Sequence, residues 1–191
     1  VKVRGDYHLL ALPAIYEMDV NATTWYYKLE EDILKIEVAI APIKNVIVLR
    51  AQSLAGNKYD FILTQVLVMG NDEYLHPLNL DIQEEQIDYF FDESTLAHQK
   101  YPELSYRTFF NTDGTYQIST DEMFYQDHKS RNNPLLSFEV NNATSFSLEI
   151  WGINKMEEVD NQQRIEDLRK DYQNIHQNAY RSFHLDISQD N

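Results

Sequence analysis

The chain has 191 residues, of which 43% are hydrophobic and 13% aromatic, and this composition indicates a globular domain rich in β structure rather than a disordered chain. Its formal net charge of −15 argues against nucleic acid and anionic membrane surfaces as partners, because the field of the chain repels both. The sequence contains no cysteine, which excludes disulfides, thiolate catalysis and cysteine metal sites.

The N-terminal third of the sequence predicts a series of strands separated by turns. Residues 7–20 are rich in apolar side chains but contain Pro13, which is typical of an edge strand or a bent strand. Residues 25–30 predict the next strand. Residues 34–40 then alternate with period two, as expected of a strand with one buried face. Residues 59–69 are almost continuously apolar, which predicts a central strand that is covered on both faces.

The central part of the sequence is less regular. Residues 73–103 contain a His-Pro pair and an aromatic cluster but receive no assignment. Two strand-like runs, 104–110 and 115–119, flank Asp113-Gly114, and this pair predicts a tight hairpin turn with a positive φ. Residues 126–133 predict a polar loop. Two further strands, at 135–140 and 145–151, complete the β region.

The periodicity changes near the C-terminal end of the sequence. Ile165, Leu168, Tyr172, Ile175 and Ala179 recur at spacings of three and four residues, which predicts an amphipathic helix. No alternation of strands and helices precedes it, so a parallel α/β sheet is not expected.

These patterns predict a mainly β fold, a two-sheet antiparallel β-sandwich with a C-terminal α-helix. We assign residues 1–155 to the sandwich domain, residues 156–181 to a linker helix packed on it, and residues 182–191 to a tail. The chain starts with Val1 rather than methionine, which is the pattern expected of an excised domain or of a processed protein. No signal peptide and no apolar run of membrane-spanning length is visible, so we expect a cytoplasmic location, although secretion stays open.

Motifs for metal binding, cofactor binding or catalysis are not found in the sequence. The six histidines are dispersed and form no spacing typical of metal ligands, so no metal site is predicted. The 31 acidic residues offer many carboxylate pairs, and nothing selects one pair for glycoside hydrolysis. We therefore predict no catalytic residue and no cofactor.

Three aromatic residues are the candidates for ligand binding: Trp25, Tyr27 and Trp151. Flat aromatic side chains can stack on sugar rings, which makes carbohydrate the ligand class that these residues indicate. Strand alternation places Trp25 and Tyr27 on one face and Tyr26 on the other. The competing interpretation is that half of the aromatic side chains alternate into the core of the sandwich and supply most of its buried area.

The order of features in two segments is similar to a known family. Residues 25–50 (WYYKLEEDILKIEVAIAPIKNVIVLR) and 59–77 (YDFILTQVLVMGNDEYLHP) resemble the N-terminal β-sandwich, or supersandwich, of the cellobiose-phosphorylase-like enzymes of glycoside hydrolase families 94 and 65. Residues 145–173 (SFSLEIWGINKMEEVDNQQRIEDLRKDYQ) resemble the way in which that sandwich closes and continues into a linker helix. The resemblance implies a covalently attached (α/α)6 catalytic barrel. The catalytic acid of the family lies in that barrel, so no catalytic residue carries over to this chain.

The leading functional hypothesis is therefore a non-catalytic β-sandwich domain of a larger carbohydrate-active enzyme, which packs against the catalytic domain and supports its substrate cleft. One alternative is a stand-alone carbohydrate-binding module of the jelly-roll type. Another is a protein-interaction domain without a small ligand, and a complete small enzyme is the remaining one.

Overall fold

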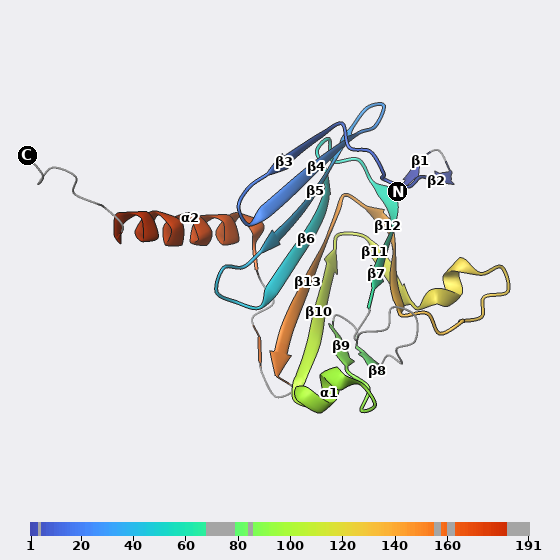
Figure 1. Ribbon diagram of the computed structural model, residues 1–191. Coiled ribbons are helices and arrows are strands. Elements are labelled where there is room, and N and C mark those ends of the chain that lie inside the picture. The colour runs from blue at the N-terminus through green and yellow to red at the C-terminus, as the bar shows by residue number, and fades with distance from the viewer. Residues whose placement is uncertain (4, 68–78, 84–85, 155–157, 160–162, 183–191) are drawn as a thin grey trace, which may run out of the picture.

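The computed structural model of the protein describes residues 1–3, 5–67, 79–83, 86–154, 158–159 and 163–182. These residues form two antiparallel sheets that face each other, which confirms the predicted β-sandwich (Figure 1). The larger sheet contains, in spatial order, β3 (Ile15–Met18), β4 (Ala22–Lys28), β5 (Ile33–Ile40), β6 (Val46–Ser53), β13 (Ser145–Asn154), β10 (Leu104–Thr112), β9 (Gln86–Phe90) and β8 (Asn79–Ile82). The smaller sheet contains β11 (Thr115–Ser119), β12 (Leu135–Ala143), β7 (Tyr59–Val66), β1 (Lys2–Val3) and β2 (Asp6–Tyr7).

The main hydrophobic core fills the space between the two sheets. Phe138 of β12 is fully buried and stacks on Phe110 of β10, with 4.6 Å between the ring centroids. Leu34 of β5 and Leu136 of β12 are 1% and 0% exposed in the same cluster. Leu34 points into this core, as the period-two pattern of residues 34–40 predicts. The expected single buried face is wrong for β5, because Glu37 and Ala39 on the opposite face are 3% and 0% exposed.

A second, smaller core lies on the outer face of the larger sheet, under helix α2 (Ile165–Ser182). Ile165 and Leu168 are each 2% exposed and pack in a cluster with Val48 and Trp151. Asn21 Nδ2 donates to the Leu168 carbonyl at 3.1 Å, and this bond ties the helix to the turn before β4. Figure 1 shows α2 leaving the sandwich beyond this contact. The helix thus packs on the sandwich through its first turns, where Ile165 and Leu168 repeat at the predicted spacing.

The start of the C-terminal helix differs from the sequence prediction. We expected it at residue 156, whereas α2 begins at Ile165. Residues 158–159 and 163–164 adopt no regular structure, and the backbone N–H of Gln163 donates to Glu149 of β13 at 3.0 Å. The N–H group of Gln163 is therefore bound to the sheet just before the helix starts.

The predicted hairpin around Asp113-Gly114 is wrong. β10 pairs with β9 and β13 in the larger sheet, while β11 pairs with β12 in the smaller one, so the turn crosses from one sheet to the other. Gly114 does not have the expected positive φ. Glycine is needed there for a different reason, since a Cβ atom would lie 2.3 Å from the Asn141 carbonyl oxygen. The close approach of two backbones selects glycine at this position.

The long apolar strand of the prediction is central in its sheet but is covered on one face only. β7 lies between β12 and β1, and Phe61 is buried in the core. Val66, on the same strand, is 64% exposed. The predicted covering of both faces is therefore wrong for β7.

The unassigned central region contains regular structure where the chain is described. It forms β8, β9 and a short helix, α1 (Leu96–Lys100). The Thr95 side chain caps the start of α1 by accepting a hydrogen bond from the backbone N–H of His98. The His76-Pro77 turn and the tail residues 183–191 lie outside the described residues. Among the helices that the structure describes, none has the length and apolar character needed to cross a membrane.

Candidate functional surfaces

The structure separates the three aromatic residues that the sequence analysis selected for ligand binding. Tyr27 packs against the main core, and strand alternation places Trp25 on the same face of β4. Trp151 lies in the smaller core on the opposite face of the sheet, 6% exposed, where its Nε1 donates to Glu149 Oε2 at 3.2 Å. The three side chains therefore do not form one aromatic platform, and a ligand role for each of them stays a prediction.

An exposed apolar strip runs along the N-terminal segment and the edge strand β3. Leu9 and Leu12 are 91% and 90% exposed, and the four residues of β3 are all exposed. We call this surface the N-terminal strip, and it consists of Leu9, Leu12, Ile15, Tyr16, Met18 and Val20. Strand alternation places Tyr16 and Met18 on one face of β3 and Ile15 on the other, so the strip wraps around the edge strand. Exposed apolar side chains concentrated in one segment are typical of a surface that contacts another molecule or domain. The strip is therefore the strongest candidate for a docking surface.

A cavity of about 810 Å³ lies beside the N-terminal strip. Its wall includes Leu10, Leu12 and Leu29, together with Tyr27, so that apolar side chains dominate this part of the surface. Tyr27 thus lines this cavity together with leucines, whereas neither Trp25 nor Trp151 contributes to its wall. From the sequence, residues 7–20 predicted only a strand that contains a proline. The local sequence does not show whether another part of the protein will cover its apolar side chains.

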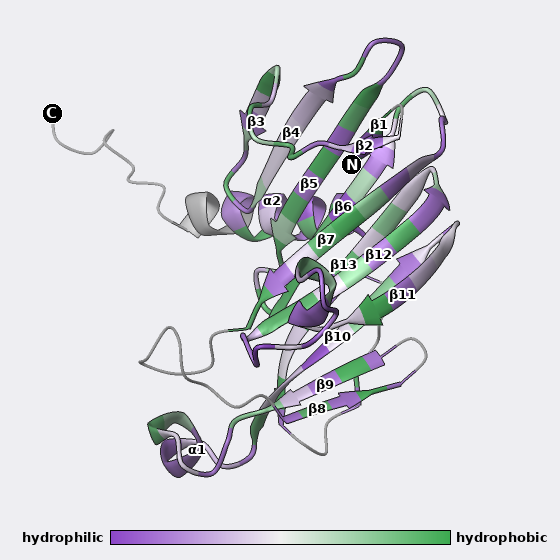
Figure 2. Ribbon diagram, turned by 90° about the vertical axis from the view of Figure 1, so that its right-hand side faces the viewer, coloured by the Kyte–Doolittle hydropathy of each residue, from purple (hydrophilic) through white to green (hydrophobic). Residues whose placement is uncertain are grey.

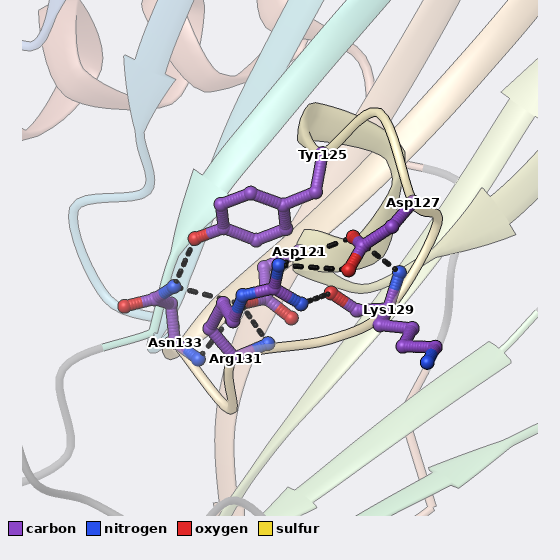
Figure 3. A network of polar contacts seen from close by, with 6 residues as sticks. All are labelled: Asp121, Tyr125, Asp127, Lys129, Arg131 and Asn133. Atoms are coloured by element: carbon purple, nitrogen blue, oxygen red, sulfur yellow. Dashed lines mark hydrogen bonds and ion pairs between the residues drawn. The ribbon is translucent and has the colours of Figure 1, made fainter.

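The loop between β11 and β12, residues 120–134, is held by one buried carboxylate (Figure 3). Asp121 is fully buried in the short 3-10 helix η1 (Asp121–Phe124). It accepts hydrogen bonds from the Ser130 hydroxyl, from the backbone N–H of Arg131 at 2.9 Å and from the backbone N–H of Asn133 at 3.0 Å. The Asn133 side chain adds a fourth bond at 2.7 Å. One side chain thereby connects the two ends of the loop.

A second group of contacts holds the middle of the same loop. The Arg131 guanidinium lies 4.5 Å above the centroid of the Tyr125 ring and also donates to the Asp127 carboxylate at 3.0 Å. The Tyr125 hydroxyl accepts a bond from Asn133 Nδ2 at 2.7 Å, as Figure 3 shows. Phe124 remains 50% exposed next to this network. The β11–β12 loop therefore presents a defined shape, which the sequence indicated only as a polar loop at residues 126–133.

The hydrogen bonds to Asp121 have a measurable consequence for the pH dependence of the loop. Burial by itself raises the pKa of Asp121, but the bonds from Ser130, Asn133 and Arg131 outweigh it and lower the pKa to about 2. A carboxyl with a lowered pKa stabilises the folded loop above its usual pKa and loses this contribution as the pH falls through the folded value. We expect the amides of Arg131 and Asn133 to lose protection from hydrogen exchange between pH 4 and pH 2, after correction for intrinsic rates.

The variant Asp121→Asn isolates this effect. Its loop should exchange faster at neutral pH and should show no transition between pH 4 and pH 2, because the titrating group is gone. Asp81→Asn, at an exposed position on β8, is the matched control and should leave the transition unchanged. A wild-type loop that stays equally protected down to pH 2 would contradict the assignment of Asp121 as its main anchor.

Metal binding finds no support in the described ranges of the chain. No group of three or more histidine, aspartate or glutamate residues lies together there in a position to hold a metal ion. The Asp121 carboxylate has its hydrogen bonds from loop donors, so it acts as an anchor of the loop.

Comparison with known proteins connects the chain to a family of phosphorylase domains. The family model described as the glycoside phosphorylase supersandwich domain matches residues 1–152, which include nearly all of both sheets. A 1,2-beta-oligoglucan phosphorylase from Listeria innocua serovar 6a is 27% identical to the chain over 125 residues. The matched region is 65% of this chain but 11% of that protein, so the chain spans a small part of the length of its relative.

Proposed function

The chain belongs to the glycoside phosphorylase supersandwich domain family, and we propose that it is the non-catalytic sandwich domain of a larger phosphorylase, where it packs against the catalytic domain and supports the substrate cleft. The observation that carries this proposal is the N-terminal strip, on which Leu9 and Leu12 are almost completely exposed. The proposed occupant of the strip is the rest of the same polypeptide, because the 125 matched residues cover only 11% of the relative.

The position of the strip supports docking of a whole domain rather than of a small ligand. Within the described part of the chain β3 is an edge strand, so one side of its backbone has no partner strand there and is available to a neighbour. Asn21, in the turn after β3, donates to the carbonyls of both Ile40 and Leu168, at 3.0 and 3.1 Å. The edge strand and helix α2 are thus joined at one residue. A domain that covers the strip can also contact α2, which leads away from the sandwich.

The β11–β12 loop is the part of the sandwich that we propose to border the substrate cleft. Its shape is determined by Asp121, Arg131 and Tyr125 before any partner binds, which avoids the entropic cost of ordering a loop during binding. The relative acts, by its name, on a 1,2-β-linked oligoglucan, and we extend this substrate class to the parent enzyme of the present chain. In that reaction phosphate breaks a glycosidic bond, and the reacting groups belong to the catalytic domain.

Hydrogen exchange can test the docking proposal directly. We expect those amides of residues 8–20 that have no backbone hydrogen bond to exchange rapidly in the 191-residue chain and slowly in a longer phosphorylase chain that contains it. Leu12→Ser should destabilise domain docking in the longer chain by about 1.5–3 kcal/mol, the usual contribution of a buried leucine, and should hardly change the stability of the 191-residue chain.

Leu54→Ser is the matched control, because Leu54 is 49% exposed and lies outside the strip. It should have little effect in either chain. Equal exchange of residues 8–20 in the two chains would exclude the strip as the docking surface.

A further inference from the structure

A second cavity, of about 640 Å³, lies on the outer face of the larger sheet beside the first turn of α2. It is separate from the N-terminal strip and from the β11–β12 loop. The polar residues that line it include Arg50 of β6, Ser147 of β13 and Asn111 of β10, with Gln163 and Glu166 on the side of the helix. The proposed docking of a catalytic domain on the N-terminal strip does not involve this cavity.

Three of these side chains form a straight polar row across the sheet. Arg50 pairs with Ser147 in the register of β6 and β13, and Ser147 pairs with Asn111 in the register of β13 and β10. Residues in register on adjacent strands point to the same face, so all three side chains lie on the face that α2 covers in part. The row spans about 10 Å, twice the spacing of neighbouring strands, which matches the length of two hexose rings.

The hydrogen-bonding capacity of this row is largely unused. Within the described part of the chain, the Asn111 amide and the Ser147 hydroxyl have no hydrogen-bond partner. The Arg50 guanidinium contacts Glu166 at 3.5 Å, a long bond that leaves most of its donors available. Glu149, two residues after Ser147 on the same face of β13, instead accepts hydrogen bonds from Trp151 and from Gln163. The row thus offers donors and acceptors together.

The balance of charges in the cavity selects a neutral ligand. Arg50 and Arg164 bring positive charge, while Glu166 and Asp113 bring negative charge, so neither an anion nor a cation is favoured. Val48 and Ile165 belong to the same wall, but each is only 2% exposed, so contact with a ligand would come from the polar side chains of the row. We propose that this cavity is a binding site for a neutral sugar of one or two hexose units, held by Asn111, Ser147 and Arg50.

Trp151 can report on occupancy of the site. Gln163 donates its backbone N–H to Glu149 Oε1 at 3.0 Å, and the other oxygen of Glu149 accepts from Trp151 Nε1 at 3.2 Å. A ligand that displaces Gln163 therefore changes the surroundings of the indole. Because the chain has two tryptophans, Trp25→Phe leaves Trp151 as the single emitter.

The experiment is a titration of the 191-residue chain with glucose, a β-linked glucose disaccharide, the corresponding trisaccharide and inorganic phosphate, followed by fluorescence and calorimetry. We expect a saturable response to a sugar and none to phosphate. Asn111→Ala and Ser147→Ala should each raise the Kd by about 3–10-fold, the loss expected for one or two neutral hydrogen bonds. Asn174→Ala, at an exposed position on α2, is the control and should leave the Kd unchanged.

Three results would overturn the proposal. One is the absence of a saturable response to all three sugars by calorimetry. Another is saturable binding of phosphate in place of sugar, which would make the cavity an anion site. The last is sugar binding that Asn111→Ala and Ser147→Ala leave unchanged, which would place the site elsewhere on the domain.

Discussion

Replacement of Phe138 by alanine is expected to lower the free energy of unfolding by about 3–5 kcal/mol, the range observed for large-to-small changes in a core. The side chain is 0% exposed, lies between the two sheets and stacks on Phe110. Its removal leaves a void that neighbouring strands of two different sheets cannot close without changing their register. Urea unfolding followed by circular dichroism measures the change.

Phe124→Ala is the matched control for this experiment. Phe124 is 50% exposed on the β11–β12 loop, so its truncation should change the free energy of unfolding by less than about 1 kcal/mol. Similar losses for the two variants would mean that the space between the sheets is not the main source of stability. Such a result would contradict the sandwich core as described.

Replacement of Leu168 by alanine is expected to detach α2 from the sandwich. Leu168 is 2% exposed, and with Ile165 it supplies the buried apolar contact of the helix. The expected loss is about 2–4 kcal/mol for a buried leucine. Tertiary packing supplies most of the stability of a helix in a protein, so the detached segment should also lose helical content. The decrease is measured as the helical signal at 222 nm and as faster amide exchange in α2.

Ile175→Ala provides the control on the same helix. Ile175 is 40% exposed and lies about two helical turns beyond Leu168, so its truncation should leave helical content and docking nearly unchanged. In a longer phosphorylase chain the same variant becomes informative, because loss of stability there would indicate that the next domain packs on this side of α2. Equal effects of both variants in the 191-residue chain would contradict docking through the first turns.

Local periodicity explains the predictions that succeeded. The alternation of residues 34–40 corresponds to β5, and the three-and-four spacing from Ile165 corresponds to the helical face that packs on the sheet. Both patterns depend on which side of one element is apolar, and neighbouring residues determine that property. Figure 2 shows how strands with alternating hydropathy are distributed over both sheets.

The failed predictions involve contacts between distant segments. Asp113-Gly114 is a typical pair for a hairpin turn. The same pair, however, also fits a turn in which the chain leaves one sheet and enters the other. Gly114 is required by the carbonyl of Asn141, 27 positions further along. The three predicted ligand residues were placed on opposite faces of one sheet by strand register, which no local pattern reveals.

The amino-acid sequence by itself determined the β-rich class, most strand positions, the C-terminal helix and the similarity to a phosphorylase sandwich, because periodicity and composition act over short distances. The tertiary structure alone decided which surfaces remain available. The N-terminal strip is exposed because β3 is the edge of the larger sheet among the strands that the structure describes. Asp121 is an anchor because Ser130 and Asn133 fold back onto it. The polar row of Arg50, Ser147 and Asn111 exists only through the register of three strands, since residues far apart in sequence share a face once hydrogen bonds between strands align them.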